Sequence, residues 1–361
     1  MTGGIAHLGA ERVVRAFKRA LLAPWWFAQL FTSAKSFCDN PLIGSPSLNA
    51  RGLHVLRLRL AHALTWARRR RLGRAVSAAD REAFERDGYV LRHDFLPPAK
   101  FEALRRQLLA HAAPAREMVQ GDTITRRIAV DRELMAAVPE VSELVADPTW
   151  QRLTRYVAGY RRPAWTYVQT ILNQVRDAPP DPQTRLHADT FHPTMKAWLF
   201  LTDVAADEGA LSYVPGSHRL TPARLAWERA VSLTAQTHPD RLTARGSFRI
   251  DDAELVALGL PPPRLFAVPA NTLVVADTFG FHARGPSARP SIRIELWGYD
   301  RRNPFLPWTT DGLLALFGLT QRRGPLYWQL LDRMERWGFG RSPWRDAGRT
   351  TPGSPSVASQ D

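Results

Sequence analysis

The spacing of apolar residues predicts helices at both ends of the chain and short strands between them. From Ala10 to Leu22, and again from Leu53 to Arg71, apolar residues recur at helical spacing and basic residues fall largely opposite them. Shorter helices are predicted before Gly88, after Pro98 and over residues 131–158. Beyond Pro163 the helical spacing of apolar residues weakens.

Short strand-like runs, separated by Gly, Pro, Asp and Asn, dominate the sequence after Pro163. One earlier run, Tyr89 to Phe95, has the same character. The later runs are Trp165 to Asn173, Ala197 to Asp203, Leu211 to Val214, Phe266 to Val268, Thr272 to Asp277 and Ile292 to Tyr299. Several short strands spaced in this way predict a mainly β fold, a sandwich or barrel with flanking helices.

Composition excludes several classes of protein. The 361 residues are 45% hydrophobic and 23% charged, which is typical of a globular enzyme-sized chain. The single cysteine, Cys38, allows neither an intrachain disulfide nor a cysteine-cluster zinc site. The longest early apolar run, Ala20 to Phe31, is shorter than the roughly 20 residues that span a bilayer, and Lys18 and Arg19 interrupt any signal peptide. We therefore expect a cytoplasmic protein.

The net charge of +15 is concentrated in the two flanks. Residues 1–80 carry +10 and residues 301–361 carry +4, whereas the region between them carries +1. Seven of the twelve tryptophans also lie in the flanks. Tryptophan and arginine together suit a peripheral contact with an anionic membrane, here the inner face. Helices that pack on the core and leave their arginines in water would give the same pattern. No nucleic-acid-binding motif is present, so we do not expect nucleic acid as a partner.

Changes in composition, charge and predicted secondary structure divide the chain into four parts. Residues 1–77 form a basic, aromatic, helical extension, and residues 78–300 form the core domain. Residues 301–342 are predicted to be a helical C-terminal extension. Residues 343–361 are rich in Pro, Gly, Ser and Thr, so we expect a disordered tail.

The segment around His187 and Asp189 is the first candidate for chemistry. On a strand, residues two apart face the same way, so both side chains can reach one ion. A third ligand, His282, follows the predicted strand Thr272 to Asp277. Two histidines and one carboxylate leave positions open on a metal, as in non-haem Fe(II) oxygenases. A His-x-Asp pair is weak evidence by itself.

Arg293 strengthens this interpretation because it lies eleven residues beyond His282. Its strand alternates Ile292, Ile294 and Leu296 with Arg293, Glu295, Trp297 and Tyr299. If the second face lines a barrel, a buried guanidinium there needs an anionic partner. A dicarboxylate cosubstrate would supply one through a bidentate contact. The alternative keeps Arg293 on the solvent face, paired with Glu295.

At this point the chain resembles the phytanoyl-CoA dioxygenase family of Fe(II)/2-oxoglutarate-dependent oxygenases. The matching segments are 84–90, 94–96, 187–189, 198–203, 207–211 and 214–218, together with His282 and Arg293. The resemblance covers about residues 78–300. It implies a double-stranded β-helix, which is a cupin-like jelly roll, with iron held by His187, Asp189 and His282.

The resemblance also implies the cofactors and the reaction. Fe(II) is the metal, and 2-oxoglutarate and O2 are cosubstrates. Arg293 matches the residue that anchors 2-oxoglutarate, Trp198 matches a position that lines its pocket, and Gln169 is a weaker candidate for contacting it. Related halogenases replace the carboxylate with a small residue, so Asp189 favours hydroxylation of a small-molecule or lipid-like substrate.

Four further residues have competing interpretations. His192 is a candidate for substrate contact or an ordinary loop residue, and His218 is expected to fix a hairpin. Asp277 is a candidate for orienting a metal-bound imidazole, and Arg127 for meeting an anion. The alternative function is a catalytically silent jelly roll that binds a ligand or an anionic membrane through its flanks. No hydrolase elbow or Walker loop is present.

Overall fold

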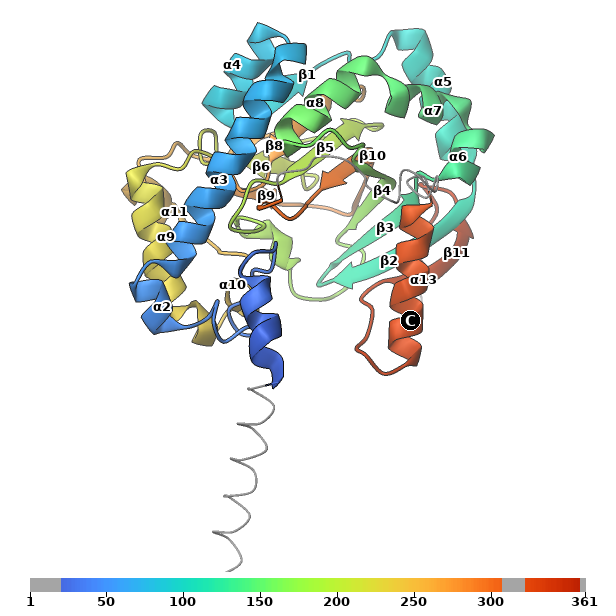
Figure 1. The fold of residues 1–361 in the computed structure, drawn as a ribbon. Helices are drawn as coiled ribbons and strands as arrows, with labels where there is room; N and C mark the ends of the chain where they lie inside the picture. The colour runs from blue at the N-terminus through green and yellow to red at the C-terminus, as the bar shows by residue number, and fades with distance from the viewer. Residues whose placement is uncertain (1–20, 307–321, 358–361) are drawn as a thin grey trace, which may run out of the picture.

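The computed structural model describes residues 21–306 and 322–357, and its centre is a pair of antiparallel sheets (Figure 1). The larger sheet has eight strands in the order β1-β8-β5-β10-β4-β3-β2-β11, and the smaller has the order β7-β6-β9. The strands are β1 Tyr89–Arg92, β2 Ala113–Gln120, β3 Thr123–Ala129, β4 Trp165–Asn173, β5 Met195–Phe200, β6 Leu211–Tyr213, β7 Arg264–Leu265, β8 Leu273–Asp277, β9 His282–Arg284, β10 Ser291–Asp300 and β11 Arg345–Thr350. The predicted β fold with flanking helices and a jelly-roll core is confirmed.

Strand β10 fixes the orientation of the cavity between the sheets. It pairs with β4 on one side and β5 on the other, so it lies at the centre of the large sheet. Its residues alternate as predicted: Ile294 and Leu296 enter the hydrophobic core with the helices, whereas Arg293, Trp297 and Tyr299 line the cavity. The cavity face of the strand is therefore polar and aromatic.

Helices cover the outer face of the large sheet and one side of the molecule (Figure 1). They are α2 Pro46–Ala50, α3 Leu53–Leu72, α4 Ala78–Asp87, α5 Pro98–Ala110, α6 Arg132–Ala137, α7 Pro139–Ala146, α8 Pro148–Ala158, α9 Pro222–Thr234, α10 Arg241–Ala244, α11 Asp252–Ala257 and α13 Arg323–Arg336. The main core joins α4, α5, α7 and α8 to β5, β8 and β10. Proline at the first turn of α7 and α8 suits a helix start, where its missing N–H is not needed.

Helix α3 packs on the core with the opposite face from the one its leucines predict. Leu56 and Leu60 are exposed, whereas Leu58 and Ala61 are buried. Its buried face also includes three arginines, Arg57, Arg68 and Arg69. Each of these guanidiniums binds backbone carbonyls of other segments. The expectation that α3 leaves its arginines in water is therefore wrong for these three, because carbonyl groups on the core supply their acceptors. It holds for Arg59, Arg70 and Arg71, which are exposed.

The disordered tail predicted for residues 343–361 is also wrong within its described part. Residues 345–350 form β11, which pairs with β2. Beyond this strand, the buried guanidinium of Arg126 on β3 donates to the carbonyls of Thr351, Ser354 and Pro355. Glu117 on β2 accepts from the same guanidinium at 2.6 Å. The buried guanidinium of Arg126 thus holds residues 351–355 against the sheet.

The basic aromatic flanks are only partly described. The predicted helix from Ala10 to Leu22 lies outside the described residues except for its last two, and residues 21–29 are helical. Within the described residues, no helix combines the length and the apolar character needed to cross a membrane. A peripheral membrane contact stays a prediction.

Because several histidines are buried, we expect the free energy of unfolding to fall in mild acid. Burial lowers the pKa of His192 and of His218 to about 3, and of His62 well below its ordinary value. The unfolded state then binds more protons below a pH of about 6.5, so the free energy of unfolding falls as the pH drops. We expect a slope of about 1.4 kcal/mol per pH unit for each histidine, measured by urea unfolding between pH 7.5 and 5.

The variant His218→Gln isolates one of these contributions. Neither ring nitrogen of His218 has a hydrogen-bond partner among the described residues. The substitution should therefore reduce the slope of the unfolding free energy against pH by about 1.4 kcal/mol per pH unit, which is the contribution of one proton. An unchanged slope would contradict a neutral buried imidazole at this position.

Candidate metal centre

Three predicted ligands, His187, Asp189 and His282, come together at the edge of the small sheet. Their candidate ligand atoms all lie within 4.8 Å of one another. Asp189 Oδ1 is 3.7 Å from His187 Nε2 and 3.6 Å from His282 Nε2. The main chains of His187 and His282 exchange two hydrogen bonds of 3.0 Å, so a two-residue antiparallel bridge sets their spacing.

The hydrogen bonds of the two imidazoles suit a metal. His187 Nδ1 lies 2.8 Å from the carbonyl oxygen of Arg185, and His282 Nδ1 lies 2.9 Å from that of Gly280. A proton on each Nδ1 leaves both Nε2 lone pairs directed at Asp189. Burial, followed by the neighbouring His282, lowers the pKa of His187 to about 3, which keeps this imidazole neutral. The donor set therefore fits a divalent transition metal.

Gly280 is required for this arrangement. Its carbonyl accepts from His282, and a Cβ atom built on it would lie 1.9 Å from the hydroxyl oxygen of Tyr213. That hydroxyl in turn donates to the carbonyl of Asp277 at 2.8 Å. The turn before His282 is therefore held by packing and by one hydrogen bond.

Asp277 does not hold a ligand imidazole, contrary to the expectation from its position. Its Oδ1 accepts from the backbone N–H groups of Thr194 and Phe279, and its Oδ2 accepts from Arg69 at 2.8 Å. The carboxylate acts on the main chain instead. It links helix α3 to the turn that leads to His282.

The metal candidates open into a cavity of about 490 Å³ between the sheets. Lys196 on β5 points to the same centre, with its Nζ 2.7 Å from Asp189 Oδ2 and 3.2 Å from His282 Nε2. Burial would raise the pKa of Asp189, but the positive charge of Lys196 is the main influence that holds it well below its usual range. The carboxyl group is therefore ionised and available to a cation.

Lys35 reaches this cavity from the N-terminal extension. Its Nζ donates to the carbonyl oxygen of Asp189 at 2.6 Å. Burial, and next the charge of Arg301, lower the pKa of Lys35 to about 7. The segment docks because the N–H groups of Phe37 and Cys38 donate to the carbonyl of Ala244. A residue far away in sequence thus completes the wall of the site.

The three predicted cosubstrate residues all line this cavity. Arg293 is 6% exposed, with its Nε 2.9 Å from Glu295 Oε2 and one terminal nitrogen bonded to the carbonyl of Gly209. Both interpretations of Arg293 hold in part, because it is inside the barrel and also paired with Glu295. Trp198 stands opposite Trp297 across β5 and β10.

Gln169 is the centre of a hydrogen-bonded chain across three strands. Its carbonyl oxygen accepts from Arg127 Nε at 2.8 Å, and its amide donates to Glu295 Oε1 at 2.7 Å. Arg127 also lies over the ring of Trp297, 4.0 Å from the ring centroid. Both ends of the Gln169 amide are therefore engaged. Its direct contact with a cosubstrate stays a prediction.

Two other histidine candidates lie away from the cavity. His192 is fully buried, with Nδ1 3.0 Å from the carbonyl of Pro193, and His218 packs against Phe84 and Trp66. Sequence reasoning misses Lys35, Lys196 and Arg301. Lys196 shares the inward phase of Trp198 on one strand, which was a usable signal, but nothing in the sequence connects Lys35 with residue 189.

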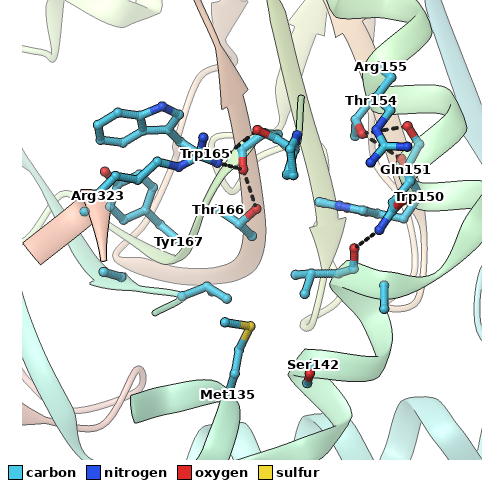
Figure 2. Close-up of a pocket in the computed structure, with 17 residues that line it drawn as sticks. Met135, Ser142, Trp150, Gln151, Thr154, Arg155, Trp165, Thr166, Tyr167 and Arg323 are labelled. Carbon is cyan, nitrogen blue, oxygen red and sulfur yellow. Dashed lines mark hydrogen bonds between the residues drawn. The ribbon is translucent and has the colours of Figure 1, made fainter. Parts of the chain in front are cut away.

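A second cavity, of about 310 Å³, lies between helix α8 and the beginning of β4 (Figure 2). Figure 2 shows Trp150, Gln151 and Thr154 on one side and Trp165 to Tyr167 on the other. None of the three metal candidates lines it, and the described lining residues include no carboxylate. It is therefore not the metal centre.

Comparisons with known proteins agree with this site. Residues 84–245 match the model of the family described as phytanoyl-CoA dioxygenase (PhyH). No curated protein matches the chain.

Several solved structures are similar to part of the chain. The epimerase SnoN in complex with Fe3+, alpha ketoglutarate and nogalamycin RO is 19% identical, with a TM-score of 0.40, over 61% of this chain and 81% of that chain. HygX from Streptomyces hygroscopicus, with nickel, 2-oxoglutarate and hygromycin B bound, is 16% identical, with a TM-score of 0.40, over 62% and 87% of the two chains. These similarities are too remote to transfer a substrate.

The family match and the His-Asp-His cluster make the chain an iron- and 2-oxoglutarate-dependent oxygenase or a related enzyme, with Fe(II), 2-oxoglutarate and O2 as cofactor and cosubstrates. Over residues 84–245, the part that matches the phytanoyl-CoA dioxygenase model, the chain is PhyH-like.

Proposed function

We propose that the protein hydroxylates an unactivated carbon of a small-molecule substrate. The observation that carries this proposal is the convergence of two imidazoles and one carboxylate on a cavity. His187, Asp189 and His282 would hold Fe(II) and leave its remaining positions to the cosubstrates.

The bound iron and 2-oxoglutarate supply the oxidising chemistry, in which one oxygen atom of O2 enters the product alcohol and the other enters succinate with release of CO2. The chain's own residues bind and orient the reactants. Arg293 has donors on its second terminal nitrogen that no described residue uses, and these suit the far carboxylate of 2-oxoglutarate.

Two features of the site favour hydroxylation. The carboxylate of Asp189 would occupy the metal position that a halide ion takes in a halogenase. This supports hydroxylation over halogenation. The aromatic rings of Trp198, Trp297 and Tyr299 line the cavity and offer apolar surface to a substrate carbon. Trp297 and Tyr299 stack with 5.2 Å between their ring centroids.

Turnover of the cosubstrate tests the proposal before the substrate is known. Purified protein, stripped of metal by a chelator, should release succinate from 2-oxoglutarate only when Fe(II) and air are both restored. Zn(II) in place of Fe(II) is the control, because it fills the same ligands without redox chemistry. Succinate release that is equal without Fe(II), or none with it, would contradict the proposal. The second result would favour the silent jelly roll.

Arg293→Gln tests the cosubstrate anchor. Loss of one charge-assisted contact should raise the KM for 2-oxoglutarate by about 10- to 100-fold, with a smaller change in kcat. Arg289→Gln, on the exposed turn before the same strand, is the matched control and should change neither constant. A KM within about two-fold of the native value would remove Arg293 from this role.

A further inference from the structure

The cavity beside the metal candidates is strongly cationic. It is lined by seven basic side chains, and Asp189 is its one carboxylate among the described residues. The seven are Lys35, Arg127, Lys196, Arg249, Arg284, Arg293 and Arg301. One 2-oxoglutarate, with two negative charges, is balanced by one Fe(II), so these two groups together leave the excess of positive charge unchanged.

Three of these side chains have carboxylate partners outside the cavity lining. Arg284 pairs with Asp181 at 2.5 Å, Arg293 with Glu295 at 2.9 Å, and Arg249 lies 3.8 Å from Asp240. Arg127 is held by the Gln169 amide and by aromatic faces.

Lys35, Lys196 and Arg301 differ from these four. Among the described residues, Lys196 has one carboxylate partner, Asp189, and Lys35 donates to the main chain of the same residue. A metal ion held by Asp189 Oδ1 would share this single carboxylate with Lys196, whose Nζ lies on Oδ2. All three side chains are partly buried, and partial removal from water makes a cation costly unless an anion lies nearby. An additional anion in the cavity would therefore stabilise them.

The position of these cations separates them from the 2-oxoglutarate anchor. Lys196 stands opposite Tyr299 in the pairing of β5 with β10, and Arg301 directly follows β10. Arg293 lies six residues before Tyr299 on the same strand, about 20 Å along the backbone at 3.3 Å per residue. A 2-oxoglutarate that joins Arg293 to the metal would bring only its keto-acid carboxylate near Lys196. The metal would hold that carboxylate, and its charge is already balanced by Fe(II).

We propose that Lys35, Lys196 and Arg301 form a second anion site, which binds an oxyanion group of the substrate beside the metal. This inference rests on the proposed function and narrows its substrate to small molecules that carry a phosphate, sulfate or carboxylate. The group would sit at the Tyr299 end of β10 and direct the remainder of the molecule toward the triad. The N-terminal extension contributes to substrate choice through Lys35.

Calorimetric titration with inorganic phosphate tests the site. Protein loaded with Fe(II) and saturating 2-oxoglutarate under anaerobic conditions should bind phosphate without releasing 2-oxoglutarate. Lys35→Gln and Arg301→Gln should each weaken phosphate binding by about ten-fold or more and change the 2-oxoglutarate affinity by less than about two-fold. Arg293→Gln should show the reverse pattern. Acetate, titrated in the same way, distinguishes a preference for phosphate from one for carboxylate.

Three controls keep the result decisive. Arg245→Gln removes an exposed cation close in sequence to Arg249 and should alter neither affinity. Lys35→Arg retains the charge and should retain phosphate binding, and circular dichroism checks that each variant is folded. No binding of phosphate or acetate, displacement of 2-oxoglutarate by phosphate, or loss of 2-oxoglutarate affinity in the Lys35 and Arg301 variants would overturn the proposal.

Failure of the proposed function would look different. Protein that binds neither Fe(II) nor 2-oxoglutarate would contradict the oxygenase, while phosphate titrated into the metal-free protein would still report on the cation cluster. Weaker phosphate binding by Lys35→Gln in that state would support the anion site independently.

Discussion

Replacing His187 with alanine should abolish both metal binding and succinate release. The triad holds its ion with three side chains, and loss of an outer partner alone costs about 10- to 100-fold in metal affinity or activity, so loss of a ligand should cost more than about 100-fold. Bound iron is measured by equilibrium dialysis, and turnover by succinate release. His111→Ala, at the end of α5 and away from the cavity, should leave both unchanged.

The fold should survive this substitution, which makes the result interpretable. The main chain of residue 187 exchanges two hydrogen bonds with residue 282, and the substitution leaves these in place. The native and variant proteins should therefore unfold at similar denaturant concentrations. Undiminished turnover by a folded His187→Ala protein would end the assignment of the metal site.

Replacing Arg69 with leucine should lower the free energy of unfolding more than any other substitution proposed above. Arg69 and Asp277 are both 0% exposed and form an ion pair of 2.8 Å, and Arg69 also donates to the carbonyl of Val157. Removing one partner leaves a buried carboxylate without its counter-ion, which costs about 3–5 kcal/mol. Arg70→Leu is the matched control, because the neighbouring side chain is exposed.

A double-mutant cycle separates the pair from the packing around it. Arg69→Leu with Asp277→Asn should lose less than the sum of the two single variants, because neither then leaves an unpaired charge. Chemical denaturation provides the free energies. Additive losses would mean that the ion pair itself contributes nothing and that the packing of Arg69 against Trp66 and Phe84 matters instead.

The sequence predicts those parts of the fold whose apolar pattern is regular. Strand β4 has the bounds expected from its pattern, and β10 extends one residue further at each end. Strands β2 and β3 are hidden because Arg116, Arg126 and Arg127 interrupt the alternation. Their charges are compensated by partners that only the folded chain supplies, such as Glu117 for Arg126.

The same limit applies to the site. His187 and Asp189 could be predicted because they lie two residues apart, and His282 and Arg293 because the order of motifs along the chain resembles that of a known family. Lys35 is 154 residues from Asp189, and its contact depends on tertiary docking. The orientation of α3 was also unpredictable, since buried arginines bonded to carbonyls outweighed the leucine stripe.

The docking of residues 35–38 on residues 244–246 has a consequence for biosynthesis. Gly246, with φ +77°, leaves room for the carbonyl oxygen of Lys35, which would lie 2.1 Å from any Cβ there. The ribosome makes residues 35–38 first, and the residues on which they pack, 244–246, are made about two hundred residues later. Synthesis proceeds at about 5–20 residues per second. The nascent chain thus exposes an unfinished pocket for about ten seconds or longer, so a premature stop before residue 246 would yield a chain that could never close this wall.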